Sequence, residues 1–393
     1  YMLAFTIKMY ILFETKTFYG FVGGLAGISN MIAPYFVGKI SDKVSKEKIE
    51  KDYEKIYFSI IALASSKDIC PFSSLGIESV SPFSKDYELK APHRFDLAVT
   101  YRCNSRCRMC DIWKKNPDIK NELQPKYYYK LPQTLKNVNI SGGEPFLKEN
   151  LEEIIEAINK TCDFPKIIIS TNGLLPEIIT EKTKKILKLQ KSNNIGIAVS
   201  IDGIGENHNR IRGIDNAFDK AIETLVSLKK LKVKNLKIAF TTGDYNVNQL
   251  KKVYQLSRKL NVEFSLATVH SSGFFFGEKK VPNINKLKNE LYWLMKNEIK
   301  SSSLKKWLRA YFTYGMIYFL STGKRILPDY SGIKSFYLDP YGDIFPSVVS
   351  SYKMGNIKEI RDFSEIKKIR VQDNPSNWMI CTARISMKLH WME

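Results

Sequence analysis

Three cysteines lie close together in the stretch Tyr-Arg-Cys-Asn-Ser-Arg-Cys-Arg-Met-Cys-Asp, which runs from residue 101 to residue 111. They are Cys103, Cys107 and Cys110, half of the chain's 6 cysteines. Three thiolates can bind three irons of a 4Fe–4S cluster and leave the fourth iron open, whereas an electron-storage cluster takes four protein ligands. A catalytic metal needs such an open position. A zinc site with a distant fourth ligand and three buried thiols are the alternatives left open by the triplet alone.

A second motif, Ser-Gly-Gly-Glu-Pro, occupies residues 141–145 after a predicted strand. Gly142 and Gly143 would let the backbone approach a ligand closely, and the Glu144 carboxylate can accept a hydrogen bond from an amine. An ordinary strand-to-helix turn would explain the same residues, Pro145 included.

Polar residues also end the following predicted strands. Asn172 lies after the third strand, and Ser200 and Asp202 close the fourth, where ligand binding and turn capping are compatible roles. Thr241 and Thr242 end the fifth strand. His270 ends the sixth and is a candidate proton donor or substrate ligand, although a lone histidine there is more often satisfied by its neighbours.

The elements that must position these motifs follow from the hydrophobic period, which alternates between 2 and 3.6 residues along residues 95–300. Strands are predicted at 95–102, 138–141, 166–171, 195–201, 236–241 and 262–270, and helices at 150–160, 177–190, 218–232, 247–260 and 284–299. Repeated βα units give parallel strands with right-handed crossovers. The prediction is an α/β fold with a partial (β/α)6 TIM-like barrel, open rather than closed, with the motifs at the carboxyl ends of its strands.

Cys-x3-Cys-x2-Cys after a strand, with Gly-Gly-Glu-Pro further along at another strand end, resembles the radical S-adenosylmethionine (SAM) superfamily. The resemblance implies one 4Fe–4S cluster on Cys103, Cys107 and Cys110, with SAM chelating the open iron through its amino and carboxyl groups. Reduction would then cleave SAM to methionine and a 5′-deoxyadenosyl radical, which requires an external electron donor such as ferredoxin or flavodoxin. The residues that it implies for SAM binding are Met109, Gly142, Gly143, Glu144, Pro145, Asn172, Ser200, Asp202 and Arg212.

Residues 301–393 are expected to form a small mixed α+β module, with a helix at 304–320 and a hairpin at 335–346. The run from Phe336, followed by Met-Gly-Asn-Ile at 354–357, resembles the SPASM or twitch extension of peptide- and cofactor-modifying radical SAM enzymes. Ser347 stands where that family usually has a cysteine, and only Cys381 remains further on. One thiol cannot hold a 4Fe–4S cluster, so the extension is predicted without one, with Cys381 as a small buried hydrophobe.

The resulting functional prediction is a radical SAM enzyme that modifies a peptide, a natural-product intermediate or a cofactor intermediate. Redox-neutral chemistry is favoured because the auxiliary electron acceptor is missing. The alternative is a non-catalytic, membrane-tethered iron–sulfur binding or assembly protein.

The N-terminal residues differ in character from the rest. Residues 17–38 carry no charge and are long enough to cross a bilayer, and the lysines from Lys39 onward would lie on the cytoplasmic side. Gly-Lys-Ile-Ser-Asp-Lys, from Gly38, resembles a loop of major-facilitator transporters. Membrane association, a hydrophobic hairpin and a fused unrelated piece therefore remain open for residues 1–66, with 67–94 as a linker before the barrel.

Composition limits the remaining functions. The net charge is +21, but the lysines are spread over many helices, so no specific nucleic-acid site is predicted. The cysteines are too few and too clustered for a disulfide framework, which favours a reducing, cytoplasmic compartment.

Overall fold

The computed structural model of the chain describes residues 92–189, 194–272, 277, 282–301, 303–368 and 377–392. The expectations for residues 1–66, including the uncharged stretch 17–38, lie outside these residues. Within the described ranges, no helix has both the length and the apolar character that a membrane span requires.

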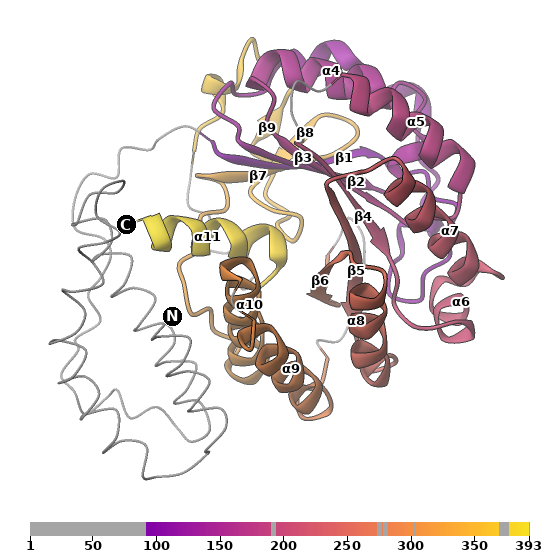
Figure 1. Cartoon of the computed structure of the whole chain (residues 1–393). Helices are drawn as coiled ribbons and strands as arrows, with labels where there is room; N and C mark the ends of the chain where they lie inside the picture. Colours follow the sequence, from indigo (N-terminus) through magenta and orange to yellow (C-terminus); the bar gives the residue numbers. More distant parts are fainter. Residues whose placement is uncertain are drawn as a thin grey trace, which may run out of the picture. The chain divides into compact units, whose positions relative to one another are not determined.

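Six parallel strands form the centre of the fold, in the spatial order β6-β5-β4-β3-β2-β1 (Figure 1). They are β1 (Arg94–Thr100), β2 (Asn137–Gly142), β3 (Lys166–Thr171), β4 (Ile195–Ser200), β5 (Asn235–Thr242) and β6 (Glu263–Thr268). Because β6 is an edge of the described sheet and does not pair with β1, the barrel is open. The predicted α/β fold with an open parallel sheet is confirmed.

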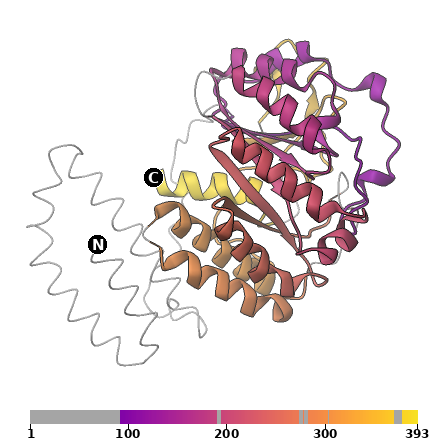
Figure 2. The same ribbon diagram turned by 45° about the vertical axis from the view of Figure 1, so that its right-hand side comes forward.

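Helices follow the strands and cover one face of the sheet. They include α4 (Leu151–Cys162), α5 (Pro176–Lys188), α7 (Ala217–Lys230) and α8 (Leu250–Lys259). In α4 the buried residues Leu151, Ile154, Ile155 and Ile158 recur at helical spacing and give the helix its apolar stripe. Figures 1 and 2 show α4, α5 and α7 on the same outer side of the strands, so the large apolar side chains between sheet and helices form the core.

The C-terminal strands continue the same sheet beyond β1. β7 (Ser335–Leu338) pairs parallel with β1, and β8 (Asp343–Phe345) and β9 (Gly355–Asn356) follow in antiparallel order. The β7–β8 turn is held by Asp339, whose Oδ1 accepts hydrogen bonds from the backbone N–H groups of Tyr341 and Asp343 at 2.9 and 2.8 Å. The predicted hairpin at 335–346 is thereby confirmed.

The described chain divides into two compact units, one with residues 92–291 and 315–388 and the other with 292–314 and 389–392. Three helices contribute to both: α9 (Ile284–Ile299), α10 (Leu304–Thr322) and α11 (Ile380–Met392). Within the smaller unit, Arg309 forms an ion pair with Glu298 at 2.9 Å. All features of the site described below belong to the larger unit.

Candidate active site

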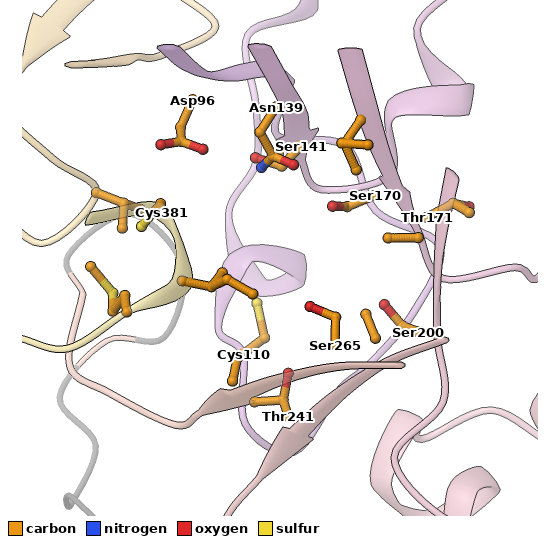
Figure 3. Close-up of a pocket in the computed structure, with 18 of the residues that line it drawn as sticks. Asp96, Cys110, Asn139, Ser141, Ser170, Thr171, Ser200, Thr241, Ser265 and Cys381 are labelled. Atoms are coloured by element: carbon orange, nitrogen blue, oxygen red, sulfur yellow. The ribbon is translucent and has the colours of Figure 1, made fainter. Parts of the chain in front are cut away.

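A cavity of about 350 Å³ lies against the sheet face opposite the helices. Polar side chains from alternate strand positions surround it in Figure 3, among them Asp96, Asn139, Ser170, Ser200 and Ser265. The interior of a closed barrel is normally filled by large branched side chains. Here most inward positions are small or polar, so the space remains open to a ligand.

The cysteine loop begins where β1 ends. Its backbone is held by the end of α6 (Glu206–Arg212): Arg106 N donates to the carbonyl of Arg212 at 2.9 Å, and Arg108 N donates to the carbonyl of Ile211 at 2.8 Å. The Ser105 hydroxyl also donates to the Arg212 carbonyl, at 3.2 Å. These bonds place all three cysteines of the loop on the cavity wall.

The three thiols have different surroundings. The Cys107 sulfur is buried, 3.1 Å from the Ser105 hydroxyl and 3.4 Å from Nη1 of Arg212, which places a positive charge beside it. Burial raises the pKa of Cys103 to about 12 and that of Cys110 to about 11, so metal binding there would release protons.

The thiol set suits a cluster better than a single ion. Among the described residues, no three cysteine, histidine or acidic side chains converge where one metal ion could sit. In a 4Fe–4S cluster each thiolate binds a different iron, so the sulfurs need not meet at one point. Three thiols on one loop, facing one cavity, therefore fit the group that the sequence predicts.

Gly142 and Gly143 line the cavity and also support the cysteine loop. A Cβ atom at Gly142 would lie 2.2 Å from the carbonyl oxygen of Thr100, and one at Gly143 would lie 2.0 Å from that of Arg102. The close approach is fixed by hydrogen bonds from Gly143 N to Thr100 O and from Glu144 N to Arg102 O, both 2.8 Å. The end of β2 thus packs directly on the backbone that leads into the cysteines.

Glu144 lies behind the cavity wall rather than in it. Its side chain is fully buried and accepts hydrogen bonds from Asn172 N at 2.7 Å, the Thr171 hydroxyl at 2.9 Å and Phe146 N at 3.2 Å. Burial raises the pKa of Glu144 to about 7, although these hydrogen bonds oppose the shift. Pro145 is buried beside it. Contact with an amine would require Glu144 to exchange one of its present partners.

Asp202 is also enclosed, and Arg212 connects it to the cysteine loop. The Asp202 carboxylate is 2.5 Å from Nη2 of Arg212 and accepts a hydrogen bond from Thr241 N at 2.8 Å. Burial raises the pKa of Asp202, while attraction to Arg212 opposes this. Burial by itself lowers the pKa of Arg212, but Asp202 and Cys107 outweigh it and raise that pKa. Arg212 lines the cavity, with Asp202 behind it.

Met109, Asn172 and Ser200 line the cavity, as does His270. Met109 packs with Cys107 in a small apolar cluster, and Asn172 donates from Nδ2 to Oδ1 of Asn104 in the cysteine loop at 2.7 Å. Burial lowers the pKa of His270 to about 4. Its imidazole is therefore neutral near pH 7, which makes it a poor proton donor there.

Several cavity residues were not anticipated. They are Asp96, Asn139 and Ser265 in the middle of the strands and, towards the strand beginnings, Arg94, Lys166 and Lys237. The available signal was the polar residue at every second strand position. This pattern indicates a shared cavity only when the strand register is known. Asp96 then aligns with Asn139, and Ala239 aligns with Ser265.

Cys381 lies on the cavity wall at the start of α11 (Figure 3). Met379, Ile380 and Arg384 also line the cavity. It is half-buried rather than enclosed, which corrects the expectation of a buried core thiol. Removal from water raises its pKa to about 12. Ser347 is buried, and Cys162 lies in α4 outside the cavity lining.

Comparison with known proteins gives this geometry a context. The family model described as the Radical SAM superfamily matches residues 97–256. The Fe-coproporphyrin III synthase of Methanosarcina barkeri is 30% identical over 163 residues, 40% of this chain and 39% of that protein. The mycofactocin maturase MftC of Mycolicibacterium smegmatis is 27% identical over 199 residues, 47% of this chain and 46% of that protein. The chain thus spans less than half the length of these two relatives.

Solved structures share the fold. Streptococcus suis SuiB bound to S-adenosylmethionine superposes with a TM-score of 0.51 at 16% identity, over 69% of this chain and 64% of that one. The family match ends at residue 256, so the likeness of the C-terminal region to SPASM or twitch extensions stays a prediction.

Proposed function

We propose that this chain, which belongs to the radical SAM superfamily, binds one 4Fe–4S cluster through Cys103, Cys107 and Cys110 and cleaves SAM reductively to modify a substrate in the cavity. The observation that carries the proposal is the placement of these three thiols on one loop, facing one cavity that is lined mostly by small or polar side chains. When bound, the cluster supplies the electron that splits SAM into methionine and a 5′-deoxyadenosyl radical.

The residues nearest the cysteine loop are proposed to hold SAM. Gly142 and Gly143 offer backbone groups at the wall, Ser200 offers a hydroxyl, and Met109 offers an apolar surface. Arg212 would bind a carboxylate, for which a guanidinium is well suited. A second set would position these groups from behind the wall: Glu144, Pro145 and Asp202, with Asn172 bridging to the loop.

The protein's own part in the reaction is orientation and the exclusion of water. The cavity wall opposite β3 and β4 is supplied by the C-terminal region, through Tyr337, Val348 and the first turn of α11. Tyr337 is fully buried, and its hydroxyl is 3.2 Å from that of Tyr101 beside the cysteine loop. This contact ties the C-terminal strands to the loop.

The proposed substrate is a peptide, a natural-product intermediate or a cofactor precursor. Support comes from relatives named as a mycofactocin maturase and an Fe-coproporphyrin III synthase, and from SuiB, solved with its precursor peptide SuiA at a TM-score of 0.51. A redox-neutral outcome is favoured because Ser347 replaces a thiol and Cys381 alone cannot hold an auxiliary cluster.

An external electron donor such as ferredoxin or flavodoxin is part of the proposal. The cysteine loop and the segment after it expose Arg106, Arg108, Lys114, Lys115 and Lys120. A cluster of exposed cations would attract an acidic carrier and orient it towards the thiols.

The test is anaerobic reconstitution with iron and sulfide, then reduction in the presence of SAM and quantification of 5′-deoxyadenosine. The Cys107→Ala variant should form none, whereas Cys162→Ala, which removes a thiol outside the cavity lining, should retain formation. Iron bound at about four per chain with SAM left intact would favour the iron–sulfur binding protein instead. Zinc binding in place of a cluster would refute the proposal.

A further inference from the structure

Arg212 places a positive charge directly beside one of the three cysteines, Cys107. Nη1 of Arg212 lies 3.4 Å from Sγ of Cys107 and donates a hydrogen bond to it. Both residues are buried, with Cys107 at 7% and Arg212 at 8% exposure. The contact is therefore shielded from water, and a charge acts more strongly on its neighbours there than it does at the surface.

The backbone of Arg212 is held against the cysteine loop. Its carbonyl oxygen accepts hydrogen bonds from Arg106 N at 2.9 Å and from the Ser105 hydroxyl at 3.2 Å. Gly213, the next residue, has a φ of 63°, and a Cβ atom there would lie 2.6 Å from the carbonyl oxygen of Arg106. The end of α6 and the cysteine loop thus pack backbone against backbone, so the Arg212 side chain extends from a point that is fixed relative to Cys107.

The Arg212 guanidinium is also held by Asp202. Nη2 of Arg212 is 2.5 Å from Oδ2 of Asp202, which is fully buried. Asp202 is in turn fixed by the chain at the end of β5: its Oδ1 accepts a hydrogen bond from Thr241 N at 2.8 Å, and its carbonyl oxygen accepts one from Nδ2 of Asn246 at 3.0 Å. A continuous series of contacts therefore runs from the end of β5 through Asp202 and Arg212 to the Cys107 sulfur.

An ion pair in this position would act on the electron that a bound cluster takes up. The reduction potential of an iron–sulfur cluster depends on its net charge, its exposure to solvent and the hydrogen bonds to its sulfurs. Reduction adds negative charge, which the thiolates share, so a cation and an N–H donor beside Cys107 stabilise the reduced form. Asp202 contacts the other terminal nitrogen of Arg212, and it therefore offsets this effect only in part.

We propose that Arg212 raises the reduction potential of the cluster bound at Cys107 and that Asp202 limits this rise, so that the pair sets how readily an external donor reduces the site. The inference rests on the proposed function for the presence of the cluster. It adds to the proposed contact between Arg212 and the SAM carboxylate, because a guanidinium has several N–H groups. Nε of Arg212 has no hydrogen-bond partner within the described part of the chain.

The experiment measures the reduced fraction of the cluster in the full chain at fixed potentials, without SAM. The chain is reconstituted anaerobically with iron and sulfide, poised with redox mediators and read by electron paramagnetic resonance. At the wild-type midpoint potential, the reduced and oxidised forms of the wild type are equal in amount. In Arg212→Gln the ratio of reduced to oxidised cluster should fall about tenfold, because a partly offset charge near the sulfur is lost. This change corresponds to a midpoint about 59 mV lower for a one-electron couple.

The variant Asp202→Asn should shift the potential in the opposite direction. The amide keeps the shape of the carboxylate but leaves Arg212 without its counter-charge, so the reduced form should exceed the oxidised form at the wild-type midpoint. Arg210→Gln is the matched control: Arg210 is exposed on the same helix, donates to Oδ1 of Asn207 at 2.9 Å and should leave the two forms equal. If Arg212→Gln does not fold, the double variant Arg212→Gln with Asp202→Asn leaves neither charge unpaired and should also lower the ratio.

The iron content of each sample separates failure of this inference from failure of the proposed function. If the wild type binds no cluster, both are wrong. If the wild type and both single variants bind the cluster at one common potential, the inference alone is wrong. A shift of the same sign in Arg212→Gln and Asp202→Asn would also refute it. So would loss of iron from both variants with an unchanged potential in the clusters that remain, which is the result that a purely structural role predicts.

Discussion

The substitution Gly143→Ala tests whether backbone contact positions the cysteine loop. The added Cβ would lie 2.0 Å from the carbonyl oxygen of Arg102, 2.6 Å from its carbonyl carbon and 2.8 Å from the carbonyl oxygen of Tyr101. All three atoms belong to the backbone, so no side-chain rotation relieves the overlap. Gly143 is not among the glycines with positive φ, so steric overlap is the whole cause of the expected effect.

The size of the effect follows from these distances. Ordinary contacts begin at 3.4 Å, so the Arg102 carbonyl and the new methyl group must separate by more than 1 Å. Overpacking of this kind costs about 1–3 kcal/mol of folding stability. A displacement of about 1 Å in a reacting group can cost about 100-fold in rate. Cys103 directly follows Arg102, so we expect a fall in 5′-deoxyadenosine formation of about 100-fold.

The assay combines urea unfolding with iron content and deoxyadenosine formation. Gly355→Ala in β9 is the matched control: its Cβ would meet Cδ1 of Ile366 at 2.6 Å, the end of a flexible side chain that can rotate away. It should leave deoxyadenosine formation near the wild-type rate. If Gly143→Ala retains both full iron content and the wild-type rate, backbone contact at β2 does not position the loop.

Three further predictions concern buried charge. Glu122→Gln should destabilise the fold by about 3–5 kcal/mol in urea unfolding, because Lys148, 2.8 Å from the Glu122 carboxylate and almost fully buried, loses its counter-charge. His208 has its pKa lowered to about 3 by burial and Arg212, so the unfolded chain binds the proton more tightly between pH 6.5 and about 3. Stability should therefore fall as pH falls through this window, by up to about 5 kcal/mol, in unfolding curves measured at several pH values. Lys130→Met should cost about 2 kcal/mol in urea unfolding, because the ammonium donates to three carbonyls of residues 357–360, at 2.6 to 3.2 Å.

A different experimental result would contradict each of these three predictions. For Glu122, the double substitution Glu122→Leu with Lys148→Met should recover most of the stability, and an equally unstable double variant would exclude the uncompensated charge as the cause. For His208, the variant His208→Gln should flatten the pH dependence, and an unchanged slope would assign it to carboxylates. For Lys130, a loss no larger than that of the exposed neighbour Lys126→Met would show that the three bonds contribute little.

The strands and long helices could be predicted because the spacing of their apolar residues in the sequence matches the face that each element buries. The predicted strand at 166–171 and the predicted helix at 284–299 coincide with β3 and α9. The short helix α6 was missed because its sequence, Glu-Asn-His-Asn-Arg-Ile-Arg, is mostly polar and is held by its contacts with the cysteine loop. In α11, apolar residues occur on every side of the helix, so no helical period appears.

The residues near the cysteines were more predictable than the rest of the cavity lining. The cysteine loop, the glycines and the strand-end polar residues are visible as local motifs, and all three cysteines do line one cavity. The motifs did not show which of these residues face the cavity. Glu144 and Asp202 are fully buried and lie behind the cavity wall. The polar middle of the cavity could not be predicted from local motifs. Asp96 and Asn139 lie on different strands, and only the strand register shows that they are neighbours.

The hollow interior has a physical cause in the two faces of each strand. In β4 and β5 the residues facing the helices are large and fully buried, such as Ile197, Val199 and Ile238. The positions between them, on the cavity side, hold Ala198, Ser200, Ala239 and Thr241. Apolar burial therefore occurs almost entirely between sheet and helices, and the fold does not need a packed interior for stability. Because the inner face contributes little to the core, it can carry the polar side chains that line the cavity.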